Sequence, residues 1–453
     1  MDFKKLVRAY YETMFKTLEG FINIDSVYDE TTVSAKDPYG SGVSNALLYV
    51  ENLAKNDGFA VKNIDNRVVE IYFGDPDKPN IGVFAHADVV PATGDWDSPP
   101  FVATVRGDKL YGRGTSDDKG PAIASYYAIK ALFDNKLIAD YSVRLVIGGD
   151  EERGSSCMHY YFNTYKAPAP LYGFTPDAQF PLIYGEKAIT NFVAKKRVAL
   201  GPIVSIKGGE AANSVIDKID LSLPFDAGLL TFLKRKHVDY SFGKEDEMMH
   251  LTIYGKSAHG SVPELGVDAA LLMFIHIGEY YQLDLFTHLG AKFSDPSGKT
   301  MDAYLHTPLL LYSTYNLGIL NYKDRELSFT VNFRYPENVN LEAHLAQLAK
   351  TLQMEISVRS TSRHLLFDPE SPFIQTLLAA YGDETGDYAS KPLAIGGGTY
   401  AKECPNTVAF GSAFAGRPGD IHSPNEHVLI TDLHAQMAIY ARAIYYLGTR
   451  LCA

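Results

Sequence analysis

The chain has 453 residues, more than one hydrophobic core usually serves, so two or three structural units are expected. Lys and Arg number 42 against 54 Asp and Glu, a formal net charge of -12, and no basic run is long enough to follow a phosphate backbone. Nucleic acid is therefore not an expected partner. The three cysteines, Cys157, Cys404 and Cys452, show neither a metal-binding pair nor a disulfide framework, which is typical of a reducing compartment and predicts a cytoplasmic protein. The sequence contains no signal-peptide pattern and no run of about 18 apolar residues, so no membrane association is predicted.

The N-terminal part of the chain predicts an α/β layer. Helical spacing of apolar residues or a high content of helix formers predicts helices at 3–20, 44–56 and 121–135. Short apolar runs rich in β-formers predict strands at 68–73, 81–84 and 141–148. Because strands and helices alternate, we expect a mostly parallel central sheet flanked by helices.

The pattern changes after about residue 184, where an α+β segment with its own sheet is expected. Strands are predicted at 191–196, 250–254, 309–315, 326–334 and 355–359, and helices at 226–235, 267–280 and 341–352. The first pattern resumes near residue 371 and closes with an apolar helix at 431–447. We therefore expect a catalytic domain, formed by residues 1–185 and 369–453, that is interrupted by an α+β lid domain of residues 186–368.

A histidine and an aspartate lie two residues apart where the apolar run 81–84 ends. Side chains alternate between faces on an extended backbone, so His86 and Asp88 are expected to point the same way. An imidazole that binds a metal needs its second ring nitrogen held by an acceptor, which a nearby carboxylate can supply. Taken alone, however, the pair is more typical of a strand-end histidine with an acidic neighbour, because isolated His-x-Asp triplets are common.

Acidic residues and a second histidine follow in later loops. Asp117 lies on a turn bounded by glycines before the predicted helix at 121–135, where Ser116 or Asp117 could also be the helix cap. The acidic triplet Asp150, Glu151 and Glu152 follows an apolar strand; it could be an ordinary solvated loop, but strand ends are where sites form in open α/β sheets.

Two further candidates lie in proline-rich turns. Asp177 lies between Pro176 and Pro181, and His422 precedes Ser423, so each could also be an ordinary turn residue. Taken together, however, two histidines, two aspartates and a glutamate in loops after strands are the ligand types expected for a pair of borderline divalent ions. A second glutamate beside the ligand glutamate would then be a candidate base.

Five segments, in this order, resemble the motifs of the aminoacylase and glutamate-carboxypeptidase family of dinuclear metallopeptidases. They are residues 86–91, 112–121, 150–152, 176–181 and 422–426. Further likeness at 23–27, 57–59, 62–66 and 184–187 extends the resemblance over nearly the whole chain, and within the family it is greatest to bacterial dipeptidases.

The resemblance implies a site for two divalent metal ions. It assigns one ion to His86, Asp117 and Asp177. It assigns the other to Asp117, Glu152 and His422, so that Asp117 bridges the pair. The donor set accepts zinc, manganese or cobalt, and zinc is the expected ion.

The family also implies roles for residues beside the ions. Asp88 would orient His86, and Glu151 would take a proton from the shared water and pass it to the leaving amine. A cis peptide bond is implied between Asp117 and Asp118.

In the lid, the resemblance assigns His259 to stabilising the tetrahedral oxyanion. Without it, His259 would be taken as a loop histidine before a helix. Asn213 and Arg334 are similar to substrate-binding positions of the family. The glycine run that includes Gly397 and Gly398 lacks the Lys-Ser/Thr of a phosphate-binding loop; a plain turn and a contact with the substrate carboxylate both remain open.

The sequence therefore predicts a metal-dependent dipeptidase that hydrolyses short unblocked peptides. An N-acyl amino acid deacylase with the same metal core is the nearest alternative, and a catalytically silent scaffold is a third. Because the lid is nearly twice as long as the insert of family members that borrow a histidine from a dimer partner, we expect a monomer. Arg153 departs from the smaller or neutral residues usual in the family at this position.

Overall fold

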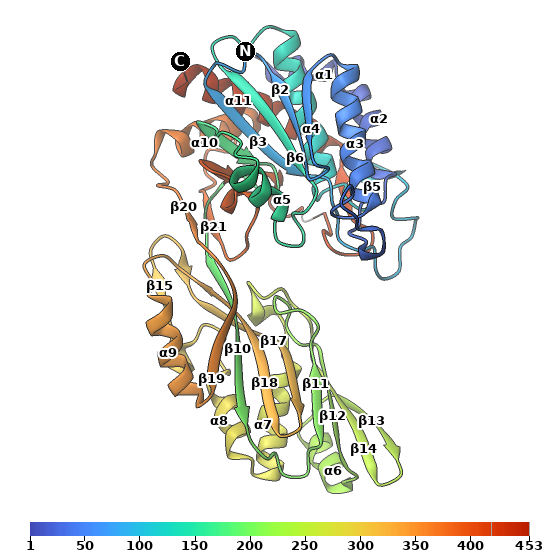
Figure 1. Ribbon diagram of the computed structural model, residues 1–453, viewed down its shortest axis with the longest axis vertical. Helices are drawn as coiled ribbons and strands as arrows, with labels where there is room; N and C mark the ends of the chain where they lie inside the picture. Colours follow the sequence, from blue (N-terminus) through green and yellow to red (C-terminus); the bar gives the residue numbers. More distant parts are fainter. Residues whose placement is uncertain (418, 453) are drawn as a thin grey trace. The chain divides into compact units, whose positions relative to one another are not determined.

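The computed structural model describes residues 1–417 and 419–452, which divide into two compact units, each with its own sheet and hydrophobic core (Figure 1). Unit 1 comprises Met1–Tyr184, Leu366–Leu393 and the described part of Gly398–Ala453. Unit 2 comprises Gly185–Leu365 and Ala394–Gly397. Unit 2 therefore includes the short segment Ala394–Gly397, which lies outside the single continuous insert predicted at 186–368.

The main sheet of unit 1 is parallel at its centre and antiparallel at its margins. Its strand order is β1-β2-β6-β3-β7-β22-β9-β20, with β21 paired to β9. The four strands β6, β3, β7 and β22 run parallel, whereas β1, β2 and β9 pair antiparallel. The strands are β1 (Ala60–Ile64), β2 (Val68–Phe73), β3 (Asn80–His86), β6 (Ser142–Gly148), β7 (Tyr172–Thr175), β9 (Ile183–Glu186), β20 (Leu365–Leu366), β21 (Leu393–Ile395) and β22 (Thr407–Ala409). The expected α/β architecture with a parallel centre is confirmed.

Helices flank this sheet (Figure 1). They are α1 (Phe3–Arg8), α2 (Tyr11–Ile22), α3 (Ser41–Asn56), α4 (Lys119–Asp134), α5 (Ser156–His159), α10 (Pro372–Thr385) and α11 (Ile430–Leu451). Helix α4 is buried along nearly its whole length because it packs against both α11 and the sheet. The prediction of a single helix at 3–20 is wrong, because the helix is interrupted at Tyr10. The N–H of Tyr10 donates to the carbonyl oxygen of Val7, only three residues earlier, and its hydroxyl donates to Asp134 of α4.

Short elements of unit 1 connect loops that are far apart in sequence. A three-stranded sheet joins β24 (His427–Leu429), β5 (Lys109–Tyr111) and β4 (Thr104–Arg106), and β23 (Ser412–Ala413) pairs in parallel with β8 (Ala178–Gln179). Single-turn helices lie at Glu30–Thr32, Tyr160–Thr164 and Tyr400–Lys402. These pairings bring the segment around residue 420 to the loops that follow β5 and β7.

Unit 2 has an eight-stranded, wholly antiparallel sheet in the order β13-β14-β12-β11-β17-β18-β10-β19. Its strands are β10 (Ala188–Arg197), β11 (Ser205–Gly208), β12 (Lys218–Pro224), β13 (Tyr240–Glu245), β14 (Met248–Tyr254), β17 (Thr314–Lys323), β18 (Glu326–Tyr335) and β19 (Glu355–Ser362), with a separate pair β15 (His306–Thr307) and β16 (Leu311–Tyr312). Its helices are α6 (Ala227–Arg235), α7 (Ala269–Tyr281), α8 (Asp284–Lys292) and α9 (Leu341–Leu352), with single turns at Pro263–Leu265 and Lys299–Met301.

One strand expected in this unit is wrong in its limits. The run predicted at 309–315 is divided between β16 and β17, because Leu311 has a positive φ of 61° and Ser313 turns its N–H to Leu305. Strand β17 then continues to Lys323 and forms a hairpin with β18.

Among the residues described here, no helix combines the length and the apolar character that crossing a membrane requires.

Candidate metal centre

Three parallel strands end at the same edge of the unit 1 sheet, and each is followed by an acidic or histidine side chain. Strand β3 ends at His86, which is in register with Gly148 at the end of β6, directly before the acidic loop. Strand β7 ends at Thr175, two residues before Asp177. Because parallel strands align their carboxyl ends, residues distant in sequence meet at this edge.

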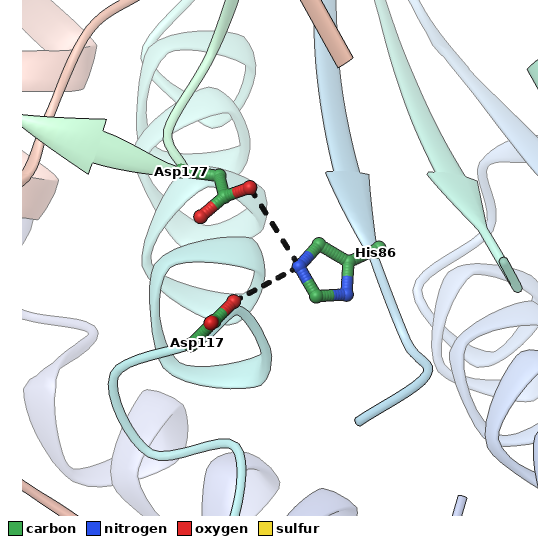
Figure 2. A group of neighbouring side chains, drawn as sticks. All are labelled: His86, Asp117 and Asp177. Carbon is green, nitrogen blue, oxygen red and sulfur yellow. Dashed lines mark hydrogen bonds and ion pairs between the residues drawn. The ribbon is translucent and has the colours of Figure 1, made fainter. Parts of the chain in front are cut away.

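The first cluster joins this edge to the start of α4 (Figure 2). The His86 Nε2 atom lies 3.0 Å from Asp117 Oδ1 and 3.8 Å from Asp177 Oδ2. One ligand atom from each of the three residues lies within 4.8 Å of the others. His86 is wholly buried, so its ring is held by packing as well as by these contacts.

The second cluster shares Asp117. The His422 Nε2 atom lies 2.9 Å from Asp117 Oδ2 and 3.2 Å from Glu152 Oε1. The two oxygens of Asp117 thus face different histidines, Oδ1 toward His86 and Oδ2 toward His422. This is the arrangement of a carboxylate that bridges two neighbouring cations.

The side chains of the two clusters shift one another's pKa values because they are buried and close together. Burial and the charge of Asp117 raise the pKa of Asp177 to about 7, and the same two causes raise the pKa of Glu152. Hydrogen bonds to Asp117 and Glu152 raise the pKa of His422 to about 11. Crowded carboxylates and imidazoles with nitrogen and oxygen donors converging on common points are the donor set of borderline divalent ions such as zinc.

Asp88 has two kinds of contact. The Nδ1 atom of His86 lies 2.9 Å from the main-chain carbonyl oxygen of Asp88 and 3.4 Å from its carboxylate Oδ1. The carboxylate accepts hydrogen bonds from the backbone N–H groups of Glu151 at 3.0 Å and Glu152 at 3.1 Å. Asp88 therefore holds the acidic loop as well as the imidazole.

The start of α4 is organised differently from a capped helix. Its N-cap residue is Asp118, whose side chain makes no capping bond, so capping by Ser116 or Asp117 is wrong. Instead, Asp118 Oδ2 accepts the N–H of His86 at 3.1 Å. The peptide bond between Asp117 and Asp118 is cis, as the family resemblance implied.

Lys119 was not singled out from the sequence, yet it is wholly buried beside the cluster. Its Nζ donates to the carbonyl oxygens of Phe21 at 3.1 Å and Ile24 at 2.7 Å, and burial lowers the pKa of the ammonium group to about 7. It fixes the end of α2 to the start of α4.

Glu151 is a neighbour of both clusters. Burial, followed by the charge of Asp177, raises the pKa of Glu151 well above its ordinary value. A glutamate held in this way can accept a proton near neutral pH when neighbouring charge is compensated.

The unusual Arg153 places its guanidinium carbon 3.4 Å from the ring centroid of Tyr28, so it is stacked on an aromatic ring.

The sequence analysis gave no role to Glu426 and Arg113, although both lie within the motif segments 422–426 and 112–121, and they form a wholly buried ion pair at 2.7 Å. The sequence carries only a weak signal for it, because a glutamate four residues after a histidine and an arginine between two glycines are both usual on a protein surface.

The expected lid residues are placed within unit 2. His259 is exposed, and its Nδ1 lies 2.6 Å from the Ser261 hydroxyl oxygen. Asn213 is next to it, since the N–H of Gly260 donates to the Asn213 carbonyl oxygen at 2.7 Å.

Arg334 is 3% exposed and makes its two hydrogen bonds to neutral oxygens. They are Asn332 Oδ1 at 2.7 Å and the Gly396 carbonyl at 2.6 Å, and burial lowers the pKa of Arg334 to about 10. Gly397 belongs to unit 2, whereas Gly398 belongs to unit 1.

Comparison with known proteins identifies the class to which this fold and site belong. The sequence pattern of Peptidase family M20/M25/M40 matches residues 82–446, so the chain belongs to this family and is a hydrolase that cleaves peptide-type bonds. The metallopeptidase resemblance expected from the motifs is thereby confirmed.

Relatives within the family are named as dipeptidases. The chain is 33% identical over 469 residues to "Putative dipeptidase SAB1611c" of Staphylococcus aureus (strain bovine RF122 / ET3-1), covering 98% of this chain and 99% of that protein. It is 32% identical over 469 residues, with the same coverage, to "Putative dipeptidase SAUSA300_1697" of Staphylococcus aureus (strain USA300).

Solved structures share the fold at lower identity. Human carnosine dipeptidase 1 is 15% identical with a TM-score of 0.61, covering 99% of this chain and 98% of that one. The M20 family metallo-carboxypeptidase Sso-CP2 from Sulfolobus solfataricus is 19% identical with a TM-score of 0.59, covering 96% and 99%.

Proposed function

We propose that this protein is a dipeptidase that uses two divalent metal ions to hydrolyse short peptides with a free amino terminus and a free carboxyl terminus. The observation that carries the proposal is the placement of Asp117, with one carboxylate oxygen toward His86 and the other toward His422. The family match and the relatives named as dipeptidases support the same reaction class.

In this proposal, His86, Asp117 and Asp177 hold one ion. Asp117, Glu152 and His422 hold the other. When bound, the ions supply a polarised amide carbonyl and a water whose pKa is lowered toward neutrality. We infer zinc as the natural ion, with manganese and cobalt as alternatives that the same donors accept.

Glu151 is the proposed proton carrier. It takes a proton from the attacking water and delivers it to the amine nitrogen as the peptide bond breaks. Asp88 fixes the backbone N–H groups of Glu151 and Glu152, so the base and a ligand are held by one carboxylate. This keeps the base at a constant position relative to the cluster.

Unit 1 is the proposed catalytic domain and unit 2 the proposed lid, which supplies groups for the substrate. His259 donates a hydrogen bond to the oxyanion, and Asn213, adjacent to it, binds the substrate. Arg334, a buried cation with neutral partners, receives the substrate carboxylate, together with backbone donors of the run that contains Gly397 and Gly398. The chain with its long lid is proposed to work as a cytoplasmic monomer.

Metal removal and replacement test the proposal directly. Chelator-treated protein should lose hydrolysis of a dipeptide panel, and zinc, manganese or cobalt added singly should restore it. N-acetyl and N-succinyl amino acids are assayed in parallel. Faster turnover of these acyl compounds would show a deacylase instead, and no hydrolysis of any amide after metal addition would overturn the proposal.

A further inference from the structure

We propose that Glu426 is a positioning residue that fixes the loop bearing Asp117 against the loop bearing His422. The inference rests on the metal centre proposed above. It assigns a function to a buried carboxylate that touches neither the substrate nor an ion in that proposal.

The side chain of Glu426 is 0% exposed and is bonded almost entirely by the Asp117 loop. Its oxygens accept backbone N–H groups from Gly114 at 3.1 Å, Ser116 at 2.9 Å and Asp117 at 3.2 Å. Arg113 Nη1 donates to Oε2 at 2.7 Å. Three N–H groups of one turn directed at one carboxylate fix the turn's backbone, and hence the direction in which Asp117 leaves it.

The same loops are joined by their main chains. The Gly112 N–H donates to the Glu426 carbonyl oxygen at 3.0 Å, and the Ser116 hydroxyl donates to the His427 carbonyl oxygen at 2.8 Å. The N–H of His427 in turn closes the loop around His422 by donating to the Gly419 carbonyl oxygen at 2.9 Å. Glu426 therefore links two proposed ligands. His422 lies four residues before it in the chain, and the N–H of Asp117 donates to its carboxylate.

The charge of Arg113 reduces the electrostatic repulsion between Glu426 and the nearby acidic cluster. A buried carboxylate next to Asp117 would otherwise repel it, but the guanidinium, itself 1% exposed, compensates the charge of Glu426. A neutral amide could accept some of the N–H groups, but its own N–H₂ would face another donor. The carboxylate is thus the side chain that can satisfy all these donors at once.

An ordinary structural ion pair provides the comparison. Glu70 and Arg144 are also both 1% exposed, at 3.1 Å. Glu70 accepts from Arg144, Tyr72 and Tyr161, all through side chains and none from a ligand loop. Glu70→Gln therefore breaks a buried Glu–Arg pair of the same kind without touching the Asp117 turn.

The experiment compares Glu426→Gln with Glu70→Gln in the full-length protein. Cobalt(II) is titrated into chelator-treated protein, and binding is followed by its visible absorption, with thermal melting of the metal-free forms measured alongside. Glu426→Gln should bind cobalt about 10- to 100-fold more weakly with an altered spectrum, as loss of an outer hydrogen-bond partner does at other metal sites. Glu70→Gln should lower the melting temperature and leave cobalt affinity within about twofold of the wild type.

Unchanged cobalt affinity and spectrum in folded Glu426→Gln, or an equal loss in Glu70→Gln, would overturn the inference while the metal centre stands. If Glu426→Gln does not fold, Ser116→Ala removes a single hydrogen bond between the same loops, the one from the Ser116 hydroxyl to the His427 carbonyl oxygen. Several-fold weaker cobalt binding by this variant supports the inference, and unchanged binding overturns it. Wild-type protein that binds no cobalt would overturn the proposed metal centre itself.

Discussion

The carboxylate of Asp88 accepts the backbone N–H of Glu151 at 3.0 Å, which joins the loop after β3 to the loop after β6. The imidazole of His86 is meanwhile held most closely by the main-chain carbonyl oxygen of residue 88, at 2.9 Å. The two functions of this residue are therefore divided between its side chain and its backbone, and they can be separated by mutation.

Asp88→Asn should retain metal and lose rate. The carbonyl of residue 88 still receives His86 Nδ1, whereas an amide can accept only one of the two N–H groups from the loop bearing Glu151. We expect kcat to fall about 10- to 100-fold, with metal content measured by elemental analysis near the wild-type value. Loss of metal instead would show that the carboxylate's main task is to hold His86.

Glu151→Gln should separate proton transfer from metal binding. Both metals should remain, but kcat on a dipeptide should fall at least roughly a hundredfold because the amide cannot accept the proton. The matched variant Glu152→Gln changes the adjacent residue, whose Oε1 lies 3.2 Å from His422 Nε2, and should lose metal. Near-normal turnover in Glu151→Gln would remove this residue from the role of base.

His259→Ala tests the proposed oxyanion contact. Removing such a donor costs about 3 to 4 kcal/mol in other enzymes, so kcat should fall roughly 100- to 1000-fold while cobalt binding is retained. His250→Ala is the control, since this exposed histidine of unit 2 contacts Ser222 on the unit 2 sheet and its loss should leave kcat unchanged. Equal rates in the two variants would count against His259.

Arg334→Lys tests recognition of the substrate carboxylate. Lysine keeps a charge but cannot reproduce the planar guanidinium that bonds both Asn332 and Gly396. Hydrogen bonds to charged groups contribute about 1.5 to 3 kcal/mol, so kcat/KM for a free dipeptide should fall roughly 10- to 100-fold. A dipeptide with its C-terminus amidated should be hydrolysed poorly and almost equally by both forms; an equal loss on both substrates would contradict the assignment.

Metal-free protein should become less stable as the pH rises from about 4.5 toward 7. Burial, together with the charge of Asp117, raises the pKa of Asp177 to about 7, so at intermediate pH the folded chain holds a proton that the unfolded chain has released. Its contribution to the free energy of unfolding is present below the ordinary carboxyl pKa and is lost as the pH passes the raised value. Asp117, whose pKa is lowered through bonds to His422 and His86 that outweigh burial, acts oppositely but at lower pH.

Differential scanning calorimetry checks this expectation. The melting temperature of chelator-treated protein should fall across this range, whereas zinc-loaded protein should gain more from its metal at pH 7 than at pH 5, because the ligands must be deprotonated. A metal-free melting temperature that rises steadily with pH would contradict the charge assignments.

Much of the proposed site could be read from local sequence. His86, Asp177 and the pair Glu151 and Glu152 follow short apolar strands or turn-forming prolines, so their position at one sheet edge follows from the alternation of strands and helices. The family resemblance then grouped His86, Asp177 and Glu152 with Asp117 and His422, and these five side chains form the two clusters of the structure, with Glu151 outside both.

What the sequence by itself determined is therefore which residue types stand at the ends of which elements, because turn chemistry and hydrophobic period act over a few residues. Only the tertiary structure decided which atoms meet. It determined which oxygen of Asp117 faces which histidine. It also determined that the Asp88 carboxylate accepts the N–H of Glu151 and that the Glu426 carboxylate accepts the N–H of Asp117 in the turn before α4. These contacts join segments up to hundreds of residues apart, and their geometry comes from the packing of β3, α4 and the loop before α11, for which no local pattern codes.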